Sequence, residues 1–158
     1  MASDRCRTHA HDLALWLIAE NQLIDYAQVR PMLNIRLYEE DLITTFGRGG
    51  HIAMDCSEAV TLVFKMAGFK DPSGQGYSGY GNTDTMLATL PHYSNAHNAH
   101  TGALVIYQNP AHVSMVIEAG ADPVLFSHGS QDGPLRVALS EESTWHSGTV
   151  TFLDISTR

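Results

Sequence analysis

Five short runs with β-strand character follow one another after Gly102, and they constrain the fold more than any other feature of the sequence. They are GALVIYQ, HVSMVIE, PVLFSHG, LRVAL and TVTFLDI, and the turn signals NP, AGAD, QDGP and HSG separate them. Runs rich in Val, Ile, Thr and Phe between clusters of Gly, Pro, Asn and Asp are typical of strands joined by tight turns. The second half of the chain therefore predicts an antiparallel sheet of five to six strands.

The part of the chain before this sheet is helical in character. Apolar residues recur at helix spacing in the first segment, Pro31 interrupts a second segment, and a short third helix is expected over 37–44. The run MDCSEAVTLVFKMAGF, residues 54–69, predicts a helix that ends near Ala67 because Gly68 follows. Helices first and a sheet second indicate an α+β fold in which the helices pack on the sheet.

Composition and charge set the domain count and exclude two classes of partner. With 158 residues, 44% of them hydrophobic and 16% charged, the chain is expected to form one domain over residues 1–158, without a linker or internal repeat. The net charge is −8 and the nine Lys and Arg residues form no basic cluster, so we expect neither nucleic acid nor an anionic membrane as a partner.

The apolar runs are too short to cross a membrane. The longest candidate, LALWLIA over 13–19, falls far below the roughly 20 residues that a spanning helix needs. The start MASDRCRTHAHD also lacks the basic, apolar and small-residue order of a signal peptide. We expect a soluble monomer that is made in the cytoplasm without a signal peptide.

Cys56 is the first candidate for chemistry. The only other cysteine is Cys6, no CxxC pair is present, and both thiols are expected to be free. With Asp55 as the N-cap and Glu58 closing an acidic capping box, Cys56 becomes the first residue of the helix predicted within the run 54–69. A thiol there lies near unpaired backbone N–H groups and the positive end of the helix dipole, which favour the thiolate. The alternative is an inert core cysteine, which is common on an apolar helix face.

His112 and His128 are the candidates for a base and its partner. HVSMVIE and PVLFSHG flank the turn AGAD and should form a hairpin. If Glu118 pairs with Val124, Ser114 lies opposite His128, and His112 is the diagonal neighbour of His128 on the same face, about 7 to 8 Å away at the backbone. A slip of one residue would place the histidines on opposite faces. Either histidine alone is more often a surface strand residue or a satisfied core imidazole than a catalytic base.

These segments together resemble a known family. The stretches MDCSEAVTLVFKMAGF, TGALVIYQNPAHVSMVIEAG and VLFSHGS are similar to the NlpC-type family of papain-like cysteine peptidases, which cut bacterial peptidoglycan peptides. Within the family, the RPM, GYSGYGNT and SHGSQDGPLR segments resemble endolysin-like members from phages and related elements of actinobacteria. The resemblance covers residues 25–136.

The resemblance implies roles for individual residues. Cys56 would be the nucleophile, His112 the general base and His128 the residue that orients it. Tyr26 would stand near the oxyanion, although it is equally readable as a packing residue, and Asp55 and Ser57 match positions that hold the substrate's amine. Two departures from the family pattern are Glu58 in place of glycine and Ala103 in place of aspartate.

Other candidate sites are weaker. Three histidines, in PHYSNAHNAH, could hold zinc, but their spacing is that of a polar loop and not of a helical ligand pair. Cys6 and His9 form a dyad without a third member, and the Gly-rich loops FGRGG and SGQGYSGYG lack the lysine of a phosphate-binding loop. We therefore expect neither a metal nor another cofactor.

The sequence and the resemblance together predict a function. We expect a cysteine peptidase that cleaves peptide bonds in bacterial peptidoglycan through an acyl-enzyme and acts on the cell wall after release or delivery. The residues alone support only acyl transfer by a thiol. A thiol amidase, deamidase or acyltransferase, or a non-catalytic virion or wall-binding domain, remain alternatives.

Overall fold

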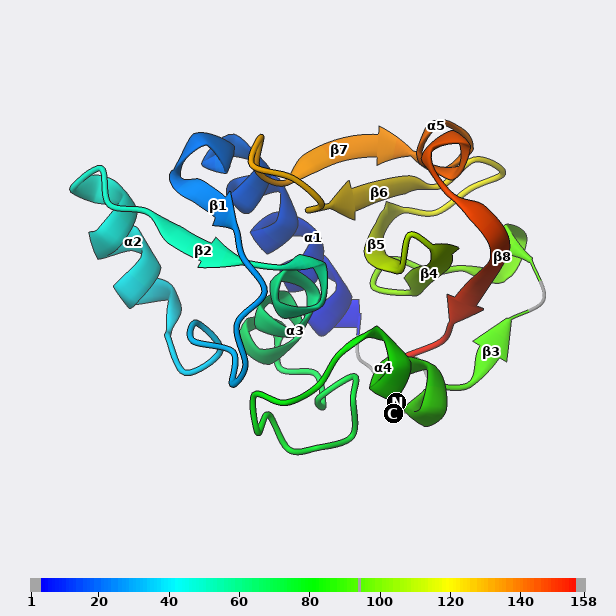
Figure 1. Cartoon of the computed structure of the whole chain (residues 1–158), viewed down its shortest axis with the longest axis horizontal. Helices are drawn as coiled ribbons and strands as arrows, with labels where there is room; N and C mark the ends of the chain where they lie inside the picture. Colours follow the sequence, from blue (N-terminus) through cyan, green and yellow to red (C-terminus); the bar gives the residue numbers. More distant parts are fainter. Residues whose placement is uncertain (1–3, 94, 156–158) are drawn as a thin grey trace.

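A six-stranded antiparallel sheet forms one half of the molecule (Figure 1). The computed structural model describes residues 4–93 and 95–155. The strand order is β3-β8-β4-β5-β6-β7, so that the last strand of the chain lies between β3 and β4. The strands are β3 (His92–Tyr93), β4 (Leu104–Asn109), β5 (His112–Glu118), β6 (Val124–Ser127), β7 (Leu135–Ala138) and β8 (Ser147–Leu153). The five strands expected from the sequence are confirmed, and β3 adds a short sixth.

Five α-helices accompany this sheet in the described part of the chain, which confirms the α+β class. Helices α1 and α3 lie beside the sheet, and α2 stands farther out (Figure 1). The helices are α1 (Asp4–Ala19), α2 (Glu39–Gly47), α3 (Cys56–Ala67), α4 (Thr83–Thr89) and α5 (Leu139–Glu142), with 3-10 turns at Asn21–Leu23, Ala96–Asn98 and Ser143–Trp145.

Helix α3 is the central element of the main core. Every residue from Cys56 to Phe64 is buried, because α1 packs on one side of the helix and β5 on the other. Its apolar side chains meet one face of the sheet through residues that alternate along β4 and β5. Gly68 ends the helix in the left-handed region, at φ 90°, as a glycine allows. The predicted ends of this helix are confirmed.

The opposite face of the sheet carries a second, smaller core. Val105 and Tyr107 of β4 and Val116 of β5 contribute to it, and Leu139 of α5 packs against it. The same face of β5 carries His112 and Ser114, because side chains two residues apart along a strand point the same way. His112 therefore lies on the face of the sheet opposite to the one that α3 covers.

A bulge between β5 and β6 changes the expected register. Glu118 pairs with Val124 as predicted, but the register then shifts, so that Val116 pairs with Leu125 instead of Phe126. A bulge inserts one extra residue into one strand, and every residue beyond it changes partner and face. The expectation that Ser114 lies opposite His128 is therefore wrong: continuing the observed register places Ser127 there.

A two-stranded parallel sheet brings a distant segment to the start of α3. β1 (Ile24–Tyr26) pairs with β2 (Ile52–Met54), and Tyr26 is the partner of Met54. The segment before Pro31, expected to be helical, thus contains a strand and only a short 3-10 turn. Tyr26 therefore lies opposite Met54, which precedes Cys56 by two residues in the sequence. No helix among the described residues is both long and apolar enough to span a bilayer.

Candidate active site

Cys56 begins α3 at a well-defined helix start. The Asp55 side chain caps the helix, because its Oδ1 atom accepts a hydrogen bond of 2.8 Å from the backbone N–H of Glu58. Cys56 follows as the first helical residue and is only 6% exposed. It lines a hollow of about 280 Å³, so the sulfur lies at the positive end of the helix and still borders a space that a substrate can enter.

The reciprocal half of the expected capping box is absent. Glu58 turns its carboxylate away from the helix start, and its Oε2 atom accepts hydrogen bonds from the backbone N–H and the side-chain amide of Asn34, at 2.9 and 2.8 Å. Burial raises the pKa of Glu58 and outweighs these hydrogen bonds. Glu58 therefore connects α3 to the segment that holds Asn34 instead of capping its own helix.

His112, at the start of β5, is the histidine that meets the thiol. Burial disfavours its positive charge, but hydrogen bonds to Cys56 and Glu142 and the negative charges of both groups raise the pKa of His112 to about 9. The Nε2 atom of His112 lies 3.0 Å from the hydroxyl oxygens of Ser114 and Ser127. Because Nε2 faces these groups, Nδ1 is the ring nitrogen left for Cys56.

Glu142 is the partner of His112 that the sequence did not reveal. It is completely buried at the end of α5, and its Oε2 atom lies 3.6 Å from Nε2 of His112. Ser114 donates a hydrogen bond of 2.7 Å to its Oε1 atom, which leaves the serine oxygen as an acceptor for His112. Burial works against the charge of Glu142, but the hydrogen bond and charge of His112 lower its pKa overall. Glu142 and Ser114 thus hold the proton of His112 on Nε2.

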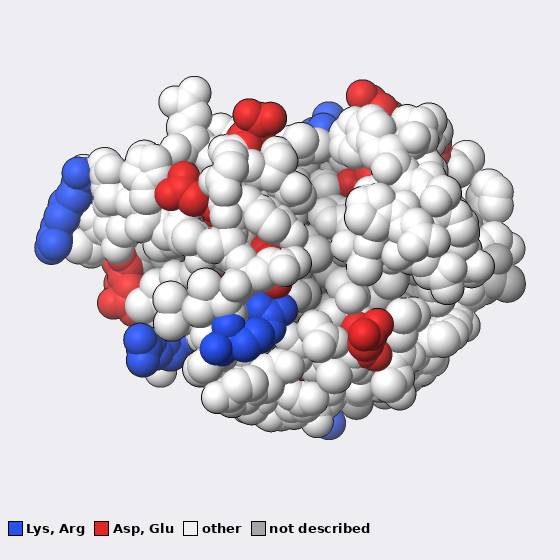
Figure 2. Space-filling model, viewed as in Figure 1, with Lys and Arg blue, Asp and Glu red and all other residues white. Residues whose placement is uncertain are grey.

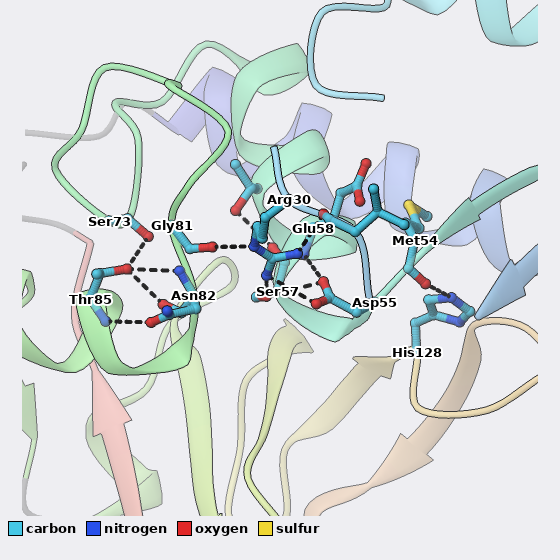
Figure 3. A network of polar contacts seen from close by, with 12 residues as sticks. Arg30, Met54, Asp55, Ser57, Glu58, Ser73, Gly81, Asn82, Thr85 and His128 are labelled. Carbon is cyan, nitrogen blue, oxygen red and sulfur yellow. Dashed lines mark hydrogen bonds and ion pairs between the residues drawn. The ribbon is translucent and has the colours of Figure 1, made fainter. Parts of the chain in front are cut away.

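His128 lies in a different place from the one expected. Its Nε2 atom donates to the backbone carbonyl oxygen of Met54 at 2.8 Å (Figure 3). It also donates to the backbone carbonyl oxygen of Asp25 at 3.1 Å. Its Nδ1 atom is buried and has no hydrogen-bond partner in the described part of the chain. Burial lowers the pKa of His128, so it is neutral at pH 7. The bulge explains why His128 points toward β1 and β2 while His112 points toward Glu142.

Tyr26 lies beside the thiol, as the resemblance implies. Burial and the negative charge of a Cys56 thiolate raise the pKa of the Tyr26 hydroxyl, which also makes a hydrogen bond with Cys56. Its ring lies 5.4 Å from that of His128, and Gln131 brackets its backbone with two hydrogen bonds. A protonated hydroxyl next to the nucleophile is in place to donate a hydrogen bond to an oxyanion.

Asp55 and Ser57 also lie beside Cys56, but other groups of the protein already occupy them. Arg30 approaches Oδ2 of Asp55 to 2.9 Å and the hydroxyl of Ser57 to 2.8 Å (Figure 3). The Ser57 hydroxyl donates to Oδ1 of Asp55 at 3.1 Å. Both side chains are thus part of a closed network around Arg30, a residue to which the sequence assigned no role.

A larger hollow continues on the other side of the nucleophile. It has a volume of about 650 Å³ and shares Gln28 and Ala111 with the hollow beside Cys56, so the two form one cleft. The imidazole of His146 stacks on that of His112 at 5.3 Å and 15° and forms part of its wall. The residues that line the larger hollow are Tyr26, Gln28, Pro110, Ala111, His112, Ser127, Gly129, Ser130, Asp132, Leu135, Glu142, Trp145 and His146.

The described residues offer no set of ligands for a metal ion. Within residues 4–93 and 95–155, no group of three or more His, Cys, Asp or Glu side chains is placed to hold a metal ion. Of the histidines considered for zinc, His92 binds the carbonyl oxygen of Leu87, and His100 meets the edge of the Tyr93 ring.

A scan of the sequence against models of protein families and a search among curated proteins give no match. The evidence for a reaction class is therefore the geometry of the cleft. A thiol at a helix start, a base that contacts it, and a buried acid that holds the proton of this base are the groups that nucleophilic acyl transfer requires.

Proposed function

We propose that this protein is a cysteine hydrolase, and specifically a papain-like peptidase of the NlpC type that cleaves peptide bonds in bacterial peptidoglycan. The observation that carries the reaction class is the contact of His112 with both Cys56 and Glu142 inside a cleft. The choice of peptidoglycan as the substrate comes from the resemblance of the Cys56, His112 and VLFSHGS segments to that family.

The proposed reaction begins with the thiolate of Cys56, which attacks the carbonyl carbon of the scissile bond. The oxyanion that forms accepts hydrogen bonds from the backbone N–H of Cys56 and the hydroxyl of Tyr26. Protonated His112 then gives its proton to the leaving amine as the carbon–nitrogen bond breaks, and a thioester remains. Water attacks the thioester after it loses a proton to His112, which releases the acid and restores the thiol.

Glu142 acts through His112 in this scheme. Its negative charge stabilises the imidazolium that forms with the thiolate, and the hydrogen bonds through Ser114 keep the ring in one orientation. We therefore assign to Glu142 the positioning role that the sequence had given to His128.

Digestion of purified peptidoglycan tests the proposal. Wild-type protein should release muropeptides with a new amine and a new carboxylate, identified by mass spectrometry, and Cys56→Ala should release none. Cys6→Ala is the matched control, because Cys6 lies outside the cleft lining, and it should remain active. Iodoacetamide should alkylate Cys56 at neutral pH faster than it alkylates a free thiol peptide.

Three other results would redirect the proposal. If Cys56→Ala lyses walls like the wild type and Cys56 reacts no faster than a free thiol, the protein is not a cysteine hydrolase. Fast alkylation without any change in the peptidoglycan would point to a thiol amidase, deamidase or acyltransferase with another substrate. Binding to walls without a reactive thiol would favour the non-catalytic domain.

A further inference from the structure

Arg30 reaches across the smaller hollow of the cleft and holds several groups together. Its Nη2 atom contacts Asp55 and Ser57, and its Nε donates to the carbonyl oxygen of Gly81 at 3.0 Å (Figure 3). Nη1 donates to the carbonyl oxygen of Val29, also at 3.0 Å. The guanidinium is thereby fixed in one position, with 26% of the side chain still exposed.

Both oxygens of Asp55 already have partners within the protein. Its Oδ1 atom accepts from the Glu58 backbone and the Ser57 hydroxyl, and Arg30 occupies Oδ2. The side chain is only 5% exposed. A positively charged group that entered the hollow would have to displace Arg30 from this buried carboxylate, and such a displacement leaves the guanidinium without its partner.

The rest of the hollow provides no substitute for that carboxylate. Asp55 is the only carboxylic acid that lines it, and apart from Arg30 its remaining lining residues carry no charge except for the thiolate of Cys56. They are Gln28, Cys56, Ser57, Asn82, Thr83 and Ala111. The hollow thus offers amides, hydroxyls and the exposed edge of a guanidinium, which suit peptide groups and not an ammonium group.

We propose that Arg30 determines specificity by closing Asp55 to amines, so that the substrate residue beside Cys56 carries an acylated amine instead of a free amino group. The enzyme would then cut within a peptide and not next to a free amino terminus. This inference rests on the proposed hydrolase function, and it replaces the expectation that Asp55 and Ser57 hold the substrate's amine. The expected role would require these two groups to be free.

Charged thiol reagents test the inference without any cleavage. Methanethiosulfonates that carry an ammonium or a hydroxyl on the same two-carbon chain form a mixed disulfide with Cys56, and methanesulfinate leaves. The ratio of the ammonium rate to the hydroxyl rate at Cys56, followed by peptide mass spectrometry, reports access for a cation and cancels the intrinsic reactivity of the thiol. Wild-type protein should give a ratio no higher than that of a free cysteine peptide.

Removal of the guanidinium should open the hollow to the cation. Arg30→Met, which keeps the length of the side chain, should raise the ratio about tenfold, because it exposes an unpaired carboxylate. Arg30→Lys should stay near the wild type, and the double variant Arg30→Met with Asp55→Asn should lose the gain. Arg36→Met, at an exposed position outside the cleft lining, is the matched control.

Folding has to be checked, because Arg30→Met also leaves a buried acid. A cooperative thermal transition and a Cys56 that still reacts differently from a free peptide mark a usable variant. Where Arg30→Met does not fold, the ratio measured on the wild type decides. A folded Arg30→Met protein with an unchanged ratio overturns the inference. So does a wild-type ratio well above that of the free peptide, whether or not Arg30→Met folds.

A substrate pair separates this inference from the proposed function. Once the cleaved bond is known, two fragments that differ only in a free or an N-acetylated amine at the residue beside the scissile bond can be compared by kcat/KM. The wild type should prefer the acetylated fragment, and Arg30→Met should weaken this preference. Cleavage with no preference overturns the role of Arg30 but leaves the hydrolase intact. If Cys56 shows the expected reagent ratio but the protein cleaves neither fragment, the proposed hydrolase function is overturned instead.

Discussion

The Oε2 atom of Glu142 lies 3.6 Å from the Nε2 atom of His112, and both side chains are buried. Burial alone would neutralise each group, yet together they favour a charged imidazole and a charged carboxylate. The serine hydroxyl of Ser114 joins the two through hydrogen bonds of 3.0 and 2.7 Å. Because of this pair, His112 is the histidine that the proposed function uses as its base.

The first prediction concerns the titration of His112. It should change protonation near pH 9 in the wild type, and Glu142→Gln should move the midpoint to lower pH, because the substitution keeps the size of the side chain and removes the negative charge. NMR of the imidazole carbon measures the midpoint directly. The alkaline fall of kcat/KM should shift in the same direction, since His112 must be protonated to assist the leaving amine.

The neighbouring acid provides the control for this titration. Glu141 lies on the same short helix but is exposed, so Glu141→Gln should leave the midpoint unchanged. Equal midpoints in Glu142→Gln and the wild type would show that the pair does not set the charge of His112.

The second prediction concerns Tyr26. Tyr26→Phe removes a hydroxyl that makes a hydrogen bond with Cys56 but keeps the ring that packs against His128. We expect kcat to fall about 10²-fold, as for the loss of one oxyanion donor, with little change in KM or thermal stability. Tyr80→Phe, at a 59% exposed position, is the matched control. A variant with unchanged kcat would leave Tyr26 as a packing residue.

The third prediction uses the close approach of Gly129 to the base. A Cβ atom added to Gly129 would lie 3.2 Å from the Cε1 atom of His112, so Gly129→Ala should push the ring away from its place. We expect about a tenfold loss in the alkylation rate of Cys56 and in kcat, because catalysis depends on the alignment of the two groups. Gly47→Ala serves for comparison, since a Cβ atom there has no neighbour within 4 Å. Equal rates in the two variants would show that the ring tolerates the shift.

Local patterns were sufficient to predict the strands after Gly102 and helix α3, but not the short strands β1, β2 and β3. The β-type runs between turn signals correspond to β4–β8, and Asp55 and Gly68 mark the ends of α3 as expected. These features depend on neighbours within one helical turn or one strand, so the sequence contains the information directly. The position of Cys56 at the helix start and its burial follow from the same signals.

The partners of His112 could not be predicted in this way. The bulge between Val116 and Glu118 adds a residue to one strand without breaking the alternation of the pattern, so the hairpin looks regular in sequence. Glu142 stands in the run LSEE, which resembles a solvated acidic turn. Its burial depends on how α5, which packs beside β7, brings Glu142 to Ser114 and His112 of β5, and long-range packing of this kind leaves no local signal.

The exclusion of polyanions, drawn from composition, stays a prediction. In Figure 2, most of the face in view is uncharged, and acidic and basic side chains are interspersed on it. A nucleic-acid interface needs Lys and Arg gathered along one path. The charge that matters for the proposed function is instead local, in the Arg30 network and the Glu142 pair.

The fourth prediction separates the two roles of the histidines. His128 follows the last residue of β6 and donates to two carbonyl oxygens, that of Met54 at the end of β2 and that of Asp25 in β1. It thereby connects the end of β6 to both strands. His128→Ala should lower the free energy of unfolding by about 1–3 kcal/mol, because buried carbonyl oxygens lose their donor. It should leave the titration midpoint of His112 in place, since His128 is neutral and adds no charge there. His128→Gln, whose amide can donate to the same oxygens, should recover part of the stability. If His128→Ala instead shifts the midpoint of His112 as far as Glu142→Gln does, His128 orients the base after all, as the sequence resemblance implied.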